Sequence, residues 1–300
     1  MRVVVSGGSG FIGQALVRHL IQQGHDTAVL TRHPDKVNLG RPLLWDAKSQ
    51  GAWSGDAAAA DAVINLAGEN IGEGRWVAAR RRRLIDSRLD ATGALVEAMR
   101  TQPSRARVFV SASAVGYYGP RGDEELDETA SRGEGFLAEM AARWEEEARA
   151  ADSVSRVVIL RFGVVIGPGG GALAKMLLPF RLGLGGRISS GRQWFSWISR
   201  DDAARVIDWA MTNEGAAGVY NATAPGPVRN RELTSALARA LHRPAIFPIP
   251  AIVMKVLFGQ MAEETLLSGQ RVVPSRLLAN GFRFERNAID SALQYALHRR

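Results

Sequence analysis

The chain has 300 residues, of which 46% are hydrophobic and 23% charged, a composition typical of a folded protein and not of a disordered one. Lysine and arginine outnumber aspartate and glutamate by 38 to 30, and the net charge of +8 suits anionic partners of any kind. Because there is no cysteine, disulfide frameworks, thiolate metal sites and cysteine nucleophiles are excluded. No apolar run is long enough to span a bilayer and the first residues do not resemble a signal peptide, so we expect a soluble, cytoplasmic protein with no membrane partner.

The first 31 residues have the pattern of a strand, a helix and a second strand. Residues 2–6 are apolar and β-branched without alternation, as in a strand buried on both faces of a parallel sheet. Apolar residues then recur at helical spacing until Gly24, which is a typical helix stop, and residues 27–31 form a second apolar strand. This order predicts a βαβ unit at the start of a doubly wound sheet.

The turn between this strand and this helix is rich in glycine. Gly8, Gly10 and Gly13 satisfy the pattern G-x-G-x-x-G, and Gly7 begins an overlapping variant. Without Cβ atoms, the backbone can turn tightly and approach a pyrophosphate, which the N–H groups at the helix start would bind. Because the motif lies between a strand and a helix, it predicts a dinucleotide site, although the alternative is a plain connecting turn. The predicted contacts are Gly7, Gly8, Ser9, Gly10, Phe11, Ile12 and Gly13.

The residues that end the second strand favour NADP over NAD. An NAD site usually has an acid here that binds the ribose 2′-hydroxyl. This chain instead has Thr31 and Arg32, and its next acid is Asp35. A guanidinium binds a 2′-phosphate through charge-assisted hydrogen bonds, so we expect Thr31 and Arg32 to contact NADP(H). The alternative is that Arg32 is an ordinary solvated loop residue.

The middle of the chain continues the alternation of strands and helices. We expect a third strand that ends at 45–46, a loop or poorly formed helix over 47–60, and a fourth strand over 62–66. A long helix over 75–100 contains four consecutive arginines, Arg80 to Arg83. Because consecutive residues point all round a helix, they form no single basic stripe, and we expect no nucleic-acid binding.

Hydroxyl groups follow the fifth predicted strand, over 108–111. Ser113, Tyr117 and Tyr118 lie just beyond it, and residues that follow parallel strands usually line the ligand crevice of such a sheet. A helix over 135–150 and a sixth strand over 157–162 come next. Residues 170–200 mix leucine, aromatic residues and glycine, which predicts a loop-rich wall of a substrate pocket.

These elements predict an α/β fold, a Rossmann-type doubly wound parallel sheet with a smaller, mainly helical C-terminal substrate lobe. We expect residues 1–168 plus 199–222 to form the dinucleotide-binding domain, and 169–198 plus 223–300 to form the lobe. Arginines at 181, 187 and 192 in the lobe would suit a small, anionic substrate.

Five strings resemble the extended short-chain dehydrogenase/reductase superfamily. They are GGSGFIG at 7–13, NLAGENI at 65–71, SASAVGYYG at 111–119, LRFGVVIGPGGG at 160–171 and LPFRLGLGG at 178–186. The later strings resemble, more narrowly, the subgroup of NAD-dependent-epimerase-like proteins that end in a small helical domain of unknown function. The resemblance covers nearly all 300 residues.

The resemblance implies a role for several residues by position. The glycine turn would hold the diphosphate, and Thr31 with Arg32 the 2′-phosphate. Ser113 matches the catalytic serine of the superfamily. The remaining implied cofactor contacts are Leu66, Ala67 and Gly68 beneath the adenosine half, Arg88 on a helix near the cofactor, and Val165 near the nicotinamide. The resemblance also implies a homodimer formed through two long helices.

One departure from the superfamily concerns the proton relay. Its Y-x-x-x-K pair falls on Phe136 and Met140 in this chain, and neither side chain transfers a proton. Hydride transfer requires a proton transfer as well, so another donor is needed. Tyr117 and Tyr118 are the nearest phenols and join Ser113 as candidate catalytic residues, although they would equally suit the pocket wall; Glu139 and Glu69 are less favoured acids. We therefore expect an NADP(H)-dependent oxidoreductase or epimerase-like enzyme, and the alternative is a non-catalytic NADP(H) sensor.

Overall fold

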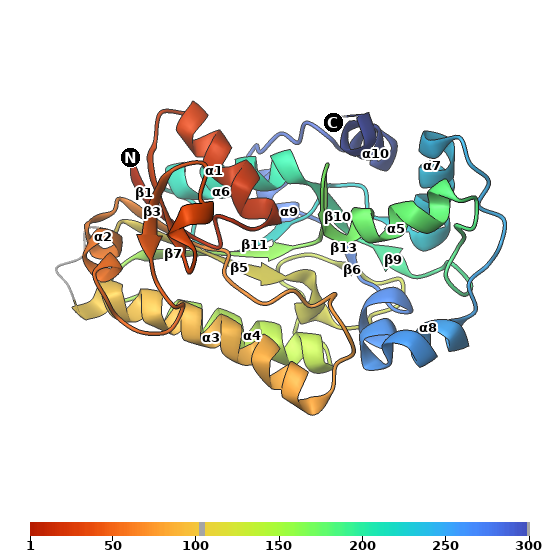
Figure 1. Ribbon diagram of the computed structural model, residues 1–300, viewed down its shortest axis with the longest axis horizontal. Coiled ribbons are helices and arrows are strands. Elements are labelled where there is room, and N and C mark those ends of the chain that lie inside the picture. The colour runs from red at the N-terminus through yellow and green to blue at the C-terminus, as the bar shows by residue number, and fades with distance from the viewer. Residues whose placement is uncertain (102–105, 299–300) are drawn as a thin grey trace.

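A computed structural model describes residues 1–101 and 106–298 and contains a seven-stranded parallel sheet (Figure 1). Its strand order is β3-β2-β1-β4-β5-β7-β11. Successive strands are added on one side of β1 as far as β3 and then on its other side from β4 onward, so the strand order reverses between β1 and β4. The strands are β1 (Arg2–Ser6), β2 (Asp26–Thr31), β3 (Arg41–Leu44), β4 (Ala62–Asn65), β5 (Val108–Ala114), β7 (Arg156–Phe162) and β11 (Gly218–Ala222). In such a sheet the crevice for a ligand lies at the carboxyl ends of the strands, beside this reversal.

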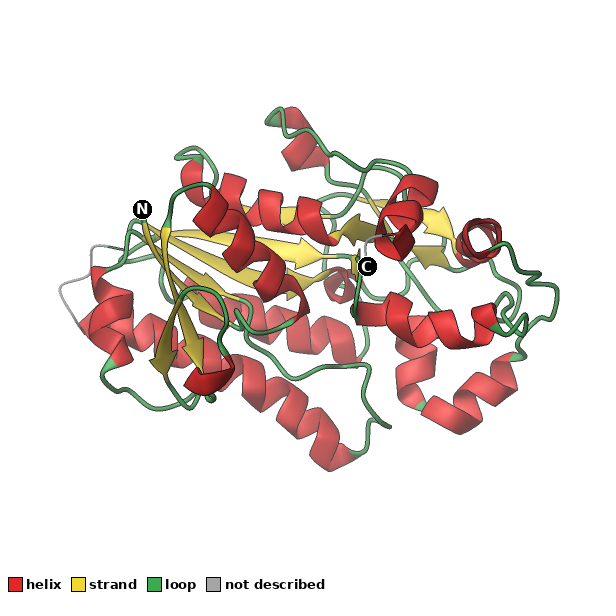
Figure 2. Ribbon diagram, turned by 45° about the horizontal axis from the view of Figure 1, so that its top comes forward, coloured by secondary structure: helices red, strands yellow, loops and turns green. Residues whose placement is uncertain are grey.

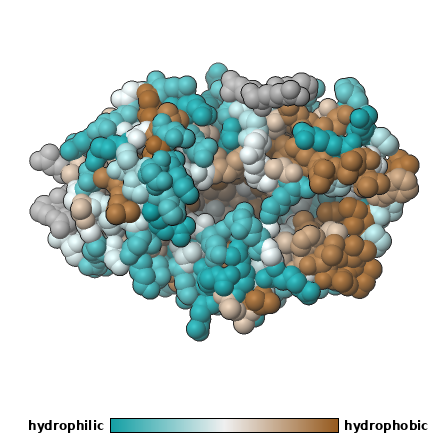
Figure 3. All heavy atoms as spheres, viewed as in Figure 1, coloured by the Kyte–Doolittle hydropathy of each residue, from teal (hydrophilic) through white to brown (hydrophobic). Residues whose placement is uncertain are grey.

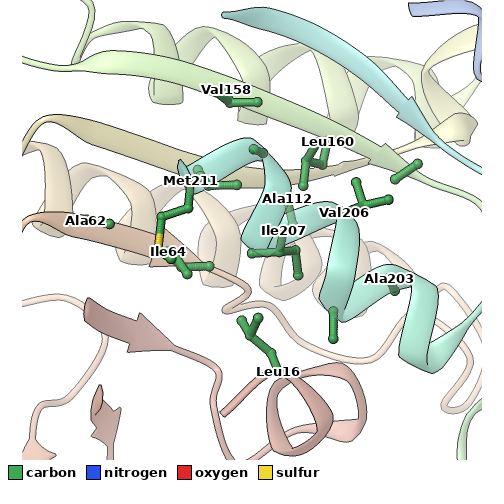
Figure 4. Close-up of a cluster of buried hydrophobic side chains, with 14 of the residues drawn as sticks. Leu16, Ala62, Ile64, Ala112, Val158, Leu160, Ala203, Val206, Ile207 and Met211 are labelled. Atoms are coloured by element: carbon green, nitrogen blue, oxygen red, sulfur yellow. The ribbon is translucent and has the colours of Figure 1, made fainter. Parts of the chain in front are cut away.

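Helices cover both faces of the sheet (Figure 2). One face carries α1 (Phe11–Gln22) and α6 (Arg200–Thr212), and the other carries α2 (Trp53–Ala59), α3 (Ala78–Thr101) and α4 (Phe136–Arg149). Figure 4 shows the hydrophobic core on the α1 and α6 face, where Leu16 of α1 and Ile207 of α6 pack with Ile64 and Leu160 of the strands. Strands β1, β2, β4, β5 and β7 are buried on both sides, as their unbroken apolar runs predict, whereas the edge strand β3 is largely exposed. The expected doubly wound fold is confirmed.

A smaller lobe has a core of its own outside the sheet. Phe180 of α5 (Gly171–Arg181), Leu233 of α7 (Asn230–Leu241) and Leu293 of α10 (Ile289–His298) pack together there. The remaining helical elements are η1 (Pro34–Lys36), η2 (Val115–Tyr118), α8 (Ala251–Phe258), η3 (Ala262–Leu266) and α9 (Ser275–Ala279). Three short strand pairs are β6 (Glu125–Leu126) with β13 (Arg271–Val272), β8 (Val164–Ile166) with β10 (Trp197–Ser199), and β9 (Trp194–Phe195) with β12 (Val228–Arg229). The separate core supports a lobe, and its boundaries as stated above stay a prediction.

Three local predictions were wrong. The third strand ends at Leu44 and not at 45–46, and the next residue, Trp45, packs edge-on against Trp53 at 5.3 Å between ring centroids. Residues 53–59 form a regular helix, since Trp53 and two alanines bury one face of that segment. Residues 171–181, expected to be loop, form α5, because Leu173 and Phe180 reach the core of the lobe.

Among the described residues, no helix is long and apolar enough to cross a bilayer.

Candidate cofactor and active site

The glycine turn leaves no room for side chains. Gly7 has a φ of +70°, and a Cβ on it would lie 2.6 Å from the carbonyl oxygen of Leu66. A Cβ on Gly13 would lie 2.2 Å from the carbonyl oxygen of Gly7, so α1 packs directly on the turn. Gly10 caps α1 without a side-chain hydrogen bond and the first turn has no acid, which leaves N–H groups free for an anion. These residues fit a bound diphosphate.

A cavity of about 340 Å³ lies beside this turn. It is lined by Gly8, Ser9, Gln14, Val17, Arg18, Val29, Thr31, His33, Lys36, Val37, Asn38 and Leu39. No carboxylate belongs to this lining, whereas two cationic side chains and an imidazole do, so the cavity favours an anionic group. The Thr31 hydroxyl accepts a hydrogen bond of 3.1 Å from the backbone N–H of His33, which fixes the end of β2.

The cavity lining includes Thr31 but not Arg32, whose side chain is exposed. The cations that line it are Arg18 of α1 and Lys36 of η1. Neither Arg18 nor Lys36 is among the contacts predicted from the sequence. Arg18 lies one helical turn after Gln14, which also lines the cavity, so the two share the face of α1 beside the turn.

The end of β4 is fixed against the glycine turn by buried hydrogen bonds. Asn65 accepts from the Ser6 hydroxyl at 2.7 Å and donates to Thr92 of α3 at 2.8 Å. Its side-chain oxygen also accepts from the N–H of Ala67 at 3.2 Å. The stretch Leu66, Ala67 and Gly68 therefore lies beside the turn, where the resemblance places the adenosine half of the cofactor.

Arg88 lies beneath this stretch and is almost fully buried. Its guanidinium donates to the carbonyl oxygens of Leu84 and Glu69, at 2.9 and 3.1 Å, and lies over the ring of Trp144. Burial lowers the pKa of Arg88 to about 10, while the charge of Glu69 acts in the opposite direction. A Cβ on Gly68 would come within 3.2 Å of the guanidinium carbon, so the glycine allows this approach. Arg88 supports the β4 loop, and its contact with a cofactor stays a prediction.

Val165 lies on β8, which pairs with β10, and is half-buried. The glycines that follow this strand pack on the ring of Phe11, because a Cβ on Gly170 would meet that ring at 2.7 Å. Arg200 covers the same ring at 5.0 Å from its centroid. Phe11, the residue after Gly10, thus joins the start of α1 to the glycine-rich loop that follows Val165.

Ser113 belongs to a buried charged network. Its hydroxyl donates to the Glu145 carboxylate at 2.7 Å, and Glu145 forms a two-point ion pair with Arg161 of β7 at 2.7 and 2.8 Å. Arg149 at the edge of α4 also reaches this carboxylate, at 3.2 Å. Ser113, Glu145 and Arg161 are each at most 3% exposed. Local sequence patterns do not group these residues, because they come from β5, α4 and β7.

The two tyrosines have different surroundings. Tyr118 is fully buried, accepts a hydrogen bond from Arg161 at 2.9 Å and donates to Asn221 at 2.7 Å. Its burial raises its pKa, although Arg161 acts in the opposite direction. Tyr117 is half-buried, and the guanidinium of Arg161 lies 3.4 Å from its ring centroid. Tyr117 is therefore the more accessible phenol, and a cation contacts it that the sequence did not reveal.

The positions of the missing proton relay are packed with apolar side chains. Phe136 lies edge-on to Trp76, with 5.2 Å between ring centroids, and Met140 and Met261 belong to the same buried cluster. The backbone N–H groups of Phe136 and Leu137 donate to the Glu264 carboxylate at 3.2 and 2.9 Å. The C-terminal part of the chain thus covers the start of α4.

The arginine run diverges, as helical geometry predicts. Arg80 is buried and forms an ion pair with Glu69, whereas Arg81 donates to Gln260 and lies over Phe136. Arg83 approaches Glu69 at 3.7 Å.

The molecular surface is hollowed near the middle of the face in Figure 3, between the side that carries α1 and the side that carries α5.

Residues 3–223 match the family model described as "NAD dependent epimerase/dehydratase family". The chain belongs to this family. Residues 249–296 match a second model, described as a domain of unknown function (DUF1731), so the resemblance to epimerase-like proteins with such a C-terminal domain is confirmed.

Relatives of the family match this chain over nearly their whole length. "Epimerase family protein Mb2239" of Mycobacterium bovis is 40% identical over 99% of this chain and 98% of its own. "Epimerase family protein SDR39U1" of Homo sapiens is 40% identical over 98% of this chain and 99% of its own. A crystal structure of the human SDR39U1 protein (isoform2) with NADPH has a TM-score of 0.90, at 38% identity and 99% coverage of both chains.

Proposed function

We propose that this family member binds NADP(H) and is an oxidoreductase or epimerase-like enzyme that works without the Tyr-x-x-x-Lys pair. Its substrate is small and unidentified, and the positive net charge of the chain favours an anionic one. The observation that carries the proposal is the glycine turn with uncapped N–H groups beside a cavity that has cations and no carboxylate. The human relative crystallised with NADPH supports the same cofactor.

The glycine turn would hold the diphosphate, as its free N–H groups and missing Cβ atoms allow. Thr31, Arg32 and Lys36 would bind the 2′-phosphate at the end of β2, and Leu66 to Gly68 would lie along the adenosine half. When bound, NADP(H) supplies or accepts the hydride. The chain must then orient the substrate and move a proton.

Among the three candidate catalytic residues, we assign the proton transfer to Tyr117. Its ring is half-buried, whereas the hydroxyls of Ser113 and Tyr118 are both engaged in buried hydrogen bonds. The phenol O–H would give its proton to a substrate carbonyl oxygen as the hydride adds to the carbonyl carbon, and the resulting phenolate would regain a proton from solvent. Ser113 and Tyr118 hold Arg161 and its neighbours in place beneath Tyr117.

Two measurements test this function. Fluorescence titration with NADPH and with NADH gives the cofactor preference, and equal or absent binding would remove the NADP(H) assignment. Turnover with a panel of sugar nucleotides and small carbonyl compounds then compares the wild type with Tyr117→Phe and Ser113→Ala. We expect Tyr117→Phe to lower kcat by about 10²- to 10⁴-fold, the usual contribution of general acid catalysis, with NADPH affinity unchanged. Full activity of Tyr117→Phe would contradict the assignment.

A second candidate function is supported by the packing of Phe136 and Met140. An apolar cluster stands where family enzymes carry the proton relay, which would suit a protein that binds NADP(H) and signals its redox state to a partner. Tight NADPH binding without turnover of any compound in the panel, together with a conformational difference between the NADPH and NADP⁺ complexes, would favour this sensor over the enzyme.

A further inference from the structure

The end of the molecule that carries α5 and α8 exposes large aliphatic side chains. We call these residues the aliphatic surface: Leu182, Leu184, Ile246, Ile252, Val256 and Leu257, which are each 54–73% exposed. Met254 is the one buried residue of α8, so this helix exposes aliphatic side chains to water. A surface helix normally presents polar residues there, and large exposed apolar patches mark interaction sites.

Backbone contacts bring the two segments of this surface together. Ser189 donates to the carbonyl oxygen of Ile249 at 2.8 Å, and Ile249 donates to that of Arg187 at the same distance. The Arg243 side chain donates to the carbonyl oxygen of Arg181 at 3.2 Å. The chain after α5 therefore runs beside the chain that leads into α8. Figure 3 shows hydrophobic residues gathered over this end of the molecule.

The two sequence ranges that carry the aliphatic surface contain basic residues and no acidic ones. Neither 171–200 nor 233–262 contains an aspartate or a glutamate, although together they span both segments. Arg181, Arg187, Arg243 and Lys255 lie within them and are exposed. An acid from the next segment, Glu263, forms an ion pair with Lys255 at 3.0 Å. Within the two ranges that carry the aliphatic surface, the charged side chains are thus all cations.

We propose that the aliphatic surface docks on the surface of a membrane that contains anionic phospholipids. Aliphatic side chains would enter the boundary between headgroups and acyl chains, and the bordering cations would contact lipid phosphates. A symmetric contact between two copies through this surface would instead bring its like charges together. Docking needs no spanning helix, so the proposal replaces the expectation of no membrane partner, which rested on the lack of a spanning segment.

The test is co-sedimentation of the full chain with vesicles. We expect binding to vesicles of phosphatidylcholine with 30% phosphatidylglycerol, weak binding to phosphatidylcholine alone, and loss of binding in high salt. Ile252→Ser with Val256→Ser should lower the partition coefficient at least tenfold. Arg187→Gln should lower it about fivefold, the effect of one cation near an anionic membrane. Matched controls are Leu44→Ser, a leucine 67% exposed on β3, and Arg107→Gln, an exposed arginine before β5; both should bind as the wild type does.

Circular dichroism and thermal unfolding check that each variant is folded. Absent binding to the anionic vesicles, or equal binding by wild type and the α8 double variant, would overturn the proposal. So would equal affinity for neutral and anionic vesicles, because the cations would then have no role. Sedimentation equilibrium covers the second-copy outcome: a dimer that the α8 double variant abolishes, without vesicle binding by the wild type, would assign this surface to self-association.

Discussion

The Ser113 hydroxyl donates a 2.7 Å hydrogen bond to the carboxylate of Glu145, which lies 32 residues further along the chain. Arg161 holds the same carboxylate from β7 with two short contacts. A serine in this position of the superfamily is implied to act on the substrate, but here its hydroxyl is oriented by a buried ion pair. The network joins β5, α4 and β7, and its Arg161 guanidinium lies against the ring of Tyr117.

The buried ion pair is expected to dominate the stability of this region. Arg161→Met leaves the Glu145 carboxylate in the interior with its exposed neighbour Arg149 as the remaining cationic partner, and should lower the free energy of unfolding by about 3–5 kcal/mol. Arg149→Gln removes only the half-exposed partner and should cost less than about 1 kcal/mol. Urea unfolding measures both. Equal losses in the two variants would show that Arg161 is not the main partner of Glu145.

Tyr118 should make stability depend on pH in the alkaline range. Burial raises its pKa above the usual value of about 10. The folded chain therefore holds this proton more tightly than the unfolded chain, so the contribution is complete below pH 10 and is lost as the pH rises through the folded pKa. The difference in unfolding free energy between wild type and Tyr118→Phe should shrink from pH 9 to pH 11.5. A difference that stays constant in urea titrations across this range would contradict the prediction.

Gly10→Val should abolish NADPH binding. A Cβ on Gly10 would lie 3.1 Å from the carbonyl oxygen of Gly7, and the larger side chain would occupy the space that the diphosphate needs. The matched control is Gly55→Val in α2, where a Cβ would meet nothing within 4 Å. Isothermal titration with NADPH compares the two variants. Normal affinity in Gly10→Val would move the cofactor away from the turn.

The cations at the end of β2 should decide between NADPH and NADH. Arg32→Glu replaces a charge-assisted contact by a repulsion and should cost at least about 1.5–3 kcal/mol of NADPH affinity, with NADH affinity little changed. Lys36→Gln should act in the same direction, because Lys36 lines the cavity beside the turn. Arg41→Gln, on the neighbouring strand and paired with Asp56, is the control. If neither Arg32→Glu nor Lys36→Gln alters the ratio of the two affinities, the 2′-phosphate does not bind there.

Much of the fold follows from local patterns in the sequence. Unbroken apolar runs at 2–6 and 157–162 predict strands with two buried faces, and the glycines at 7–13 predict the turn between the first of these strands and α1. Local patterns failed at 171–181, because glycines flank a segment whose helix is stabilised by Leu173 and Phe180 in a distant core. Tertiary packing overrides local preference in such a segment.

The sequence by itself determined the βαβ unit, the nucleotide turn and the loss of the tyrosine–lysine pair, because each depends on residues close together in the chain. Only the tertiary structure decided which cations line the cavity, that Arg161 contacts Tyr117, and that Glu145 orients Ser113. Those side chains come from separate strands and helices, and their distances are set by how the sheet brings β5, α4 and β7 together. The same holds for the aliphatic surface, since exposure is a property of the packed chain and not of any one segment.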